Sequence, residues 1–152
     1  AMKVAIAAIK FADLQNSFSA DYVFDIDRMT SFEGKTGPYL LYQAVRIKSL
    51  LDKAEYKAGG DIVISDTDRP LYLMLAEFPE MIETAARNYM PHILCDHAYK
   101  LAQAFSSFYA NTHILSEENA VQKQSWLTLS AMVLAQLETL LGLVGINIPN
   151  RM

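Results

Sequence analysis

Aromatic and basic side chains occur together at two places in this 152-residue chain, and they are its best candidates for chemistry. Tyr39 and Tyr42 lie three residues apart, and Arg46 follows Tyr42 by four. Later, two phenylalanines and Tyr109 precede a short polar loop that contains His113. Unstacked RNA bases are bound by stacking on Tyr or His and by hydrogen bonds to their edges. Tyrosines at helical spacing are also typical of a core or a protein interface, and the spacing alone favours that interpretation.

Other combinations of reactive residues do not form a catalytic or metal site. His92, Cys95 and His97 are close in sequence, but on a helix position 97 points away from position 92, and a fourth ligand is missing. Gly59 and Gly60 lack the spacing and the Lys-Ser/Thr partner of a phosphate-binding loop. No nucleophile motif is present. We therefore expect neither a catalytic residue nor a metal ligand.

Composition indicates one compact domain and limits its partners. A chain of 152 residues can bury one sizeable core. The net charge of −4 argues against binding nucleic acid through a large basic surface, but a local basic stripe remains compatible with it. A single cysteine excludes an internal disulfide, and the first residues lack the pattern of a signal peptide. We expect a cytoplasmic location.

Loop segments, prolines and capping residues divide the chain into predicted helices that could position these residues. The run Tyr22 to Ile26 alternates in polarity but is too short to imply a sheet, and Ser31 to Gly37 is typical of a loop. Pro residues are placed to begin helices, and Ser116 with two following acids is a candidate N-cap. The predicted helices run from Lys3 to Gln15, Tyr39 to Lys57, Pro70 to Phe78, Pro79 to Met90, Pro91 to Ala110, and from Ser116 through Val144.

The last predicted helix is apolar enough to be mistaken for a membrane span. Its stretch from Trp126 to Val144 has about the length a bilayer requires. However, Thr128, Ala131, Ala135 and Glu138 form a narrow small-or-polar stripe along it. That pattern predicts a central core helix with one face toward solvent or another helix, and no membrane partner.

Four segments, taken in order, resemble arginyl-tRNA synthetases of the class I, DALR type. The first is YVFDIDRMTSFEGKTGPYLLYQAVRI, from Tyr22 to Ile47, which is similar to the family's connection between catalytic and anticodon-binding domains. The others are LAEFPEMIETAAR, LAQAFSSFYANTHIL and the tail LLGLVGINIPNRM. They are spread from Tyr22 to Met152, and the resemblance extends over nearly the whole chain.

The resemblance implies an all-α fold, a helical bundle of the type shared by class I anticodon-binding domains. It places the end of the catalytic domain and a connector at residues 1–36, and the anticodon-binding domain at 37–152. It also implies that Tyr42, Tyr109, His113 and Met152 contact the anticodon loop. Arg46, one helical turn after Tyr42, is our predicted phosphate contact.

The same resemblance implies a parent enzyme that joins arginine to its tRNA with ATP and Mg²⁺. The nucleotide-binding motifs of that class are absent from these residues, so the chain alone is expected to be inactive. Its implied partners are arginine tRNA and the catalytic domain of the same protein. The alternative is a helical protein-interaction or assembly domain without RNA contact, in which the tyrosines lie in an interface.

Overall fold

The computed structural model describes residues 1–152 and contains helices without a strand, which confirms the all-α prediction. The elements in chain order are α1 (Met2–Leu14), α2 (Ile26–Thr30), α3 (Gly37–Lys53), α4 (Arg69–Ala76), α5 (Phe78–Asn88), α6 (Pro91–Asn111), the 3₁₀ turn η1 (Ile114–Ser116) and α7 (Ala120–Leu143).

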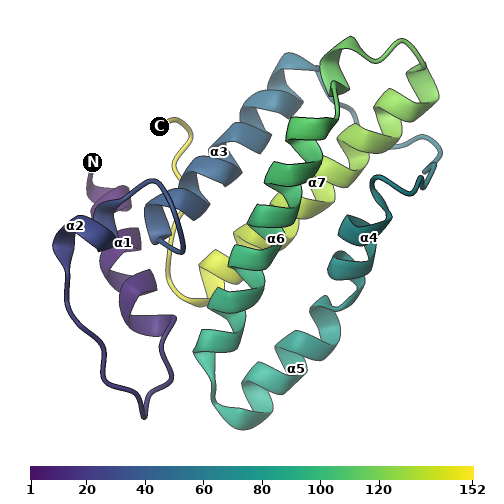
Figure 1. Ribbon diagram of the computed structural model, residues 1–152. Helices are drawn as coiled ribbons and strands as arrows, with labels where there is room; N and C mark the ends of the chain where they lie inside the picture. Colours follow the sequence, from purple (N-terminus) through teal and green to yellow (C-terminus); the bar gives the residue numbers. More distant parts are fainter.

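Three long helices, α3, α6 and α7, form the centre of the bundle, and α4 and α5 cover α6 from one side (Figure 1). Leu129, Val133 and Leu137 of α7 are fully buried, while Ala135 and Glu138 of the predicted stripe are exposed. The prediction of a core helix is therefore confirmed. By length and composition α7 would also suffice to cross a membrane, and it is the one helix of this chain that meets that description.

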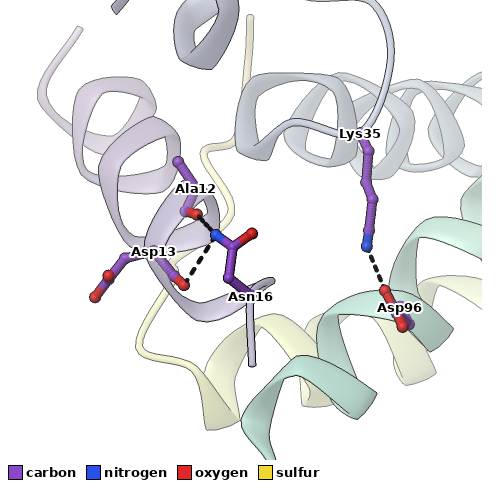
Figure 2. A network of polar contacts seen from close by, with 5 residues as sticks. All are labelled: Ala12, Asp13, Asn16, Lys35 and Asp96. Atoms are coloured by element: carbon purple, nitrogen blue, oxygen red, sulfur yellow. Dashed lines mark hydrogen bonds and ion pairs between the residues drawn. The ribbon is translucent and has the colours of Figure 1, made fainter. Parts of the chain in front are cut away.

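Helix α1 packs against the first turns of α3 at very short range. A side chain at Gly37, the first residue of α3, would overlap the backbone carbonyl of Ala7. Helix α3 is started by Thr36, whose hydroxyl accepts a hydrogen bond from the Tyr39 amide at 3.2 Å. The loop before it is tied to α6 by an ion pair between Lys35 and Asp96 (Figure 2).

Most boundaries of the predicted helices lie within two residues of the observed ones, and three larger differences remain. Helix α3 ends at Lys53 rather than Lys57, because Glu55 adopts a positive φ of 47° and turns the chain. Helix α7 begins at Ala120, capped by Asn119, whereas Ser116 closes η1. The short helix α2 was not predicted, and its cap is Asp25, whose carboxylate accepts from the Arg28 amide at 3.0 Å.

The C-terminal tail, residues 144–152, returns from the end of α7 to α1 (Figure 1). Gly145, with φ of +71°, ends α7 in a Schellman turn in which the Ile146 amide donates to the Leu141 carbonyl at 2.8 Å. Lys10 then donates to the Gly145 carbonyl at 2.9 Å, and Lys3 donates to the Ile148 carbonyl at 3.4 Å. The tail therefore runs antiparallel to α1 and ends beside α3.

Candidate nucleic-acid interface

The guanidinium of Arg46 lies among three aromatic rings from two helices. Its central carbon is 4.8 Å from the ring centroid of Tyr109 and 5.9 Å from those of Tyr42 and Phe105. Such cation–π contacts are typical of Arg and stabilise a planar cation without a carboxylate. The ion pairs of the chain join Lys35 to Asp96, Lys48 to Glu138 and Arg87 to Glu83, so no carboxylate neutralises Arg46.

Burial restricts how Arg46 can act. Its Nε and Nη2 atoms are buried without a hydrogen-bond partner. A buried donor without a partner is costly, and such groups in native proteins require an explanation. An anion bound beside the guanidinium would supply a counter-charge, but it would not reach the two buried donors, so the phosphate contact stays a prediction.

Tyr42 and Tyr39, three residues apart on α3, point to different environments. Tyr39 packs into the bundle against Tyr99, with ring centroids 5.8 Å apart, and burial raises the pKa of its hydroxyl. Tyr42 remains 46% exposed. Of this pair, only Tyr42 therefore presents a ring to a ligand, while Tyr39 has the structural role that helical spacing by itself suggests.

Met152 and Tyr42 line one open cavity of about 490 Å³ at the meeting point of α1, α3 and the tail. Phe32, from the loop before α3, contributes a third large apolar side chain. Lys3 and Arg151 add two cations to the lining. An apolar cavity with cations at its wall suits a flat ring that carries a phosphate.

His113 lies on the other side of Tyr109, in a shallow cavity that also includes Leu50 and Leu115. It directly follows the buried Thr112 at the end of α6, and its side chain is exposed. The five predicted site residues thus lie in a connected order, Met152 and Tyr42 at one cavity, Arg46 between Tyr42 and Tyr109, and Tyr109 with His113 at the next.

Sequence reasoning missed several neighbours of these residues. Phe105 was visible as an aromatic one turn before Tyr109, but its contact with Arg46 requires α6 to pack on α3. Lys3 and Phe32 could not be assigned to the cavity, because they lie in segments predicted to belong to another domain. Arg151 could have been predicted to lie at the cavity only from its position directly before Met152.

The His and Cys residues of α6 do not form a second reactive site. No three His, Cys, Asp or Glu side chains gather closely enough to hold a metal ion. Burial raises the pKa of the Cys95 thiol to about 12, so this cysteine is a neutral thiol rather than a nucleophile. Burial also lowers the pKa of His97.

Comparisons with known proteins agree on one family. The DALR anticodon binding domain family matches residues 40–152. Arginine–tRNA ligases of Hyphomonas neptunium and Maricaulis maris are each 52% identical to this chain over its whole length. The chain spans about a quarter of the length of these curated relatives, 26% in both cases.

Solved structures show the same similarity. The arginyl-tRNA synthetase of Thermus thermophilus aligns over 99% of this chain with a TM-score of 0.91 and 29% identity. The Plasmodium falciparum arginyl-tRNA synthetase aligns over 99% with a TM-score of 0.84 and 25% identity. In both cases the alignment covers 27% of the solved chain.

Proposed function

This chain belongs to the DALR anticodon-binding domain family, as its match over residues 40–152 shows, and we propose on that basis that it binds the anticodon loop of arginine tRNA. The observation that carries the proposal is the aromatic enclosure of Arg46 beside two exposed ring-binding cavities. The rings supply stacking faces for unstacked bases, and the cations supply contacts to the backbone.

The proposed roles follow the order of the side chains along the surface. Tyr42 and Met152 bind a base at the larger cavity, where Tyr42 stacks and Met152 provides a flexible apolar contact. Arg46, held in plane by Tyr42, Phe105 and Tyr109, contacts a phosphate. Tyr109 and His113 receive a second base at the smaller cavity.

For the whole protein we propose an arginine–tRNA ligase that uses ATP with Mg²⁺, of which residues 1–36 are the end of the catalytic part and 37–152 the RNA-binding domain. The start of the family match at residue 40 supports this division. Exposed large apolar side chains at the beginning of the chain support a large neighbouring part. They are Ile6, Ile9, Phe18, Tyr22, Val23, Phe24 and Ile26.

Of these, Ile6 and Ile9 form a short apolar stripe on α1, opposite the face that buries Ala8 and Phe11. A helix that is apolar on two opposite faces is typical of a helix buried between two layers. We assign this stripe to contact with the remaining part of the parent protein.

The test is binding of arginine tRNA, against a non-cognate tRNA, to the chain and to its Tyr42→Ala variant. Stacking of one base contributes about 1–3 kcal/mol. We expect Tyr42→Ala to weaken cognate binding about 5- to 100-fold. Tyr89→Ala is the matched control, because Tyr89 is 85% exposed at the junction of α5 and α6 and lies outside both cavities.

Equal effects of the two substitutions would contradict the stacking role of Tyr42. Equal binding of both tRNAs, or no binding, would contradict recognition by this chain on its own.

The second candidate is a protein-interaction domain without RNA contact. It is favoured by an apolar groove between α5, α6 and the end of α7, lined by Ile82, Ala86, Tyr89, Leu94 and Leu143 among others. In that case Tyr89→Ala would weaken binding of a protein partner, and Tyr42→Ala would leave it unchanged.

A further inference from the structure

Two lysines of α1 contact the backbone of the C-terminal tail. Lys10 donates to the Gly145 carbonyl at 2.9 Å, and Lys3 to the Ile148 carbonyl at 3.4 Å. They are seven residues apart on α1, two helical turns, and so lie on one face. Neither ammonium takes part in an ion pair, so the two backbone carbonyls of the tail are their partners.

The tail is shaped to bring its carbonyl to Lys10. Gly145 has a φ of +71°, a conformation that other residues rarely adopt. A Cβ atom at this position would overlap the Lys10 ammonium. Ile146, the next residue, is buried at 2% exposure, so the beginning of the tail is fixed on both sides.

Beyond Ile148 the tail has no hydrogen bond of its own. None of the hydrogen bonds in the structure involves residues 149–152. Nevertheless Pro149, Arg151 and Met152 line the cavity beside Tyr42. The position of Met152 therefore depends on the contacts made upstream, at Gly145, Ile146 and Ile148.

We propose that Lys10, assisted by Lys3, is a positioning residue for the RNA interface, because it holds the tail that carries Met152 against α1. This inference rests on the proposed function. It means that α1, which lies outside the residues matched by the family, affects RNA binding by holding the C-terminal tail in place. A hydrogen bond from a charged donor is stronger than a neutral one, which suits a contact made at the surface.

The first experiment is a double-mutant cycle on arginine-tRNA binding with Lys10→Ala, Met152→Ala and the double variant. Lys10→Ala is expected to weaken binding about three- to tenfold, less than the full effect of a charged hydrogen bond because the contact is exposed to solvent. In the Met152→Ala background the same substitution is expected to weaken binding by a smaller factor, because Arg151 is then the one remaining tail side chain proposed to contact RNA. Lys10→Arg, which keeps a donor cation, should restore most of the affinity.

Lys100→Ala is the matched control for the loss of one positive charge, because Lys100 is an exposed lysine of α6 without a recorded contact to the tail. If Lys10→Ala and Lys100→Ala weaken binding equally, Lys10 acts only through its charge and the proposal is overturned. An equal effect of Lys10→Ala with and without Met152 would overturn it as well.

A second measurement needs no RNA. The ε-methyl group of Met152 is followed by NMR in the methionine-labelled chain and identified by its loss in Met152→Ala. Lys10→Ala is expected to move this signal toward the position and narrow line width of an unstructured methionine, and an unchanged signal would overturn the proposal. If the wild-type chain fails to bind tRNA, the proposed function fails, while the methyl signal still decides whether Lys10 holds the tail.

Discussion

His97 is a histidine whose charged form the fold disfavours. It lies on the inner face of α6 at 7% exposure, and its Nε2 atom has no hydrogen-bond partner. Burial lowers its pKa, while the facing Glu77 and Gln136 oppose that effect in part. The folded chain therefore binds the His97 proton at a lower pH than the unfolded chain does.

This difference predicts acid destabilisation. As pH falls through the unfolded histidine value near 6.5, the unfolded state gains a proton that the folded state does not, so the free energy of unfolding decreases. We expect urea unfolding to show a loss of stability between about pH 7.5 and 5.5 that becomes smaller in His97→Gln. His113→Gln is the control for the loss of a histidine at an exposed position. An identical pH dependence of His97→Gln and the wild type would contradict this account.

Arg46 is a residue whose surroundings the sequence predicts only in part. Its position one turn after Tyr42 made it a candidate phosphate contact. Its enclosure by Phe105 and Tyr109 depends on how α6 packs on α3, which local spacing does not encode. The roles of all five site residues remain predictions, although the structure brings their side chains into one connected row.

Helices α1 and α3 pack closely enough that their backbones nearly touch. This packing requires Gly37, where any Cβ would overlap the Ala7 carbonyl. Because backbone atoms cannot move aside as a flexible side chain can, the two helices must separate to admit a methyl group.

Gly37→Ala is therefore expected to lower the free energy of unfolding by about 1–3 kcal/mol, the usual cost of overpacking. Gly142→Ala is the matched control, because Gly142 lies in the last turn of α7 with no atom near its missing Cβ. That substitution should raise stability by up to about 1 kcal/mol, through helix propensity. Denaturant unfolding of both variants is the measurement, and equal effects of the two would refute the close packing of α1 on α3.

Helix existence was easier to predict from local sequence than helix ends. The helices begun by Pro38, Pro70, Pro79 and Pro91 were all found, since Pro fixes the first turn. Helix α3 ended early because Tyr56 turns back to pack on the core, with its hydroxyl 3.3 Å from that of Thr128. Ser116 is not the N-cap of α7, as was predicted, because Ile114 is buried and the chain forms the 3₁₀ turn η1 at residues 114–116. Tertiary packing thus decided these boundaries.

The whole molecule has a negative net charge, so the positive charge available to the proposed RNA surface is confined to a few residues. The chain carries −4 overall, while Lys3, Arg46 and Arg151 gather along the row of site residues. Long-range attraction of RNA is therefore weak, and these few cations must supply the electrostatic part of binding.

If each of these three cations contacts one phosphate, the logarithm of the association constant should fall with the logarithm of salt concentration with a slope of about −2. Titrations of arginine tRNA between about 50 and 200 mM salt would measure it. A slope near zero would contradict phosphate contacts by these three cations.

The larger cavity also imposes an order on folding. Its wall combines residues 1–4 with Pro149, Arg151 and Met152, so two segments far apart in the sequence must meet to form it. During synthesis the N-terminal part can fold before the rest has been made. Helix α1 and the beginning of α3 can thus pack early, but this site can first exist only after residue 152 has been added. Until residues 149–152 have been synthesised, a nascent chain can form much of the bundle but lacks one wall of this cavity.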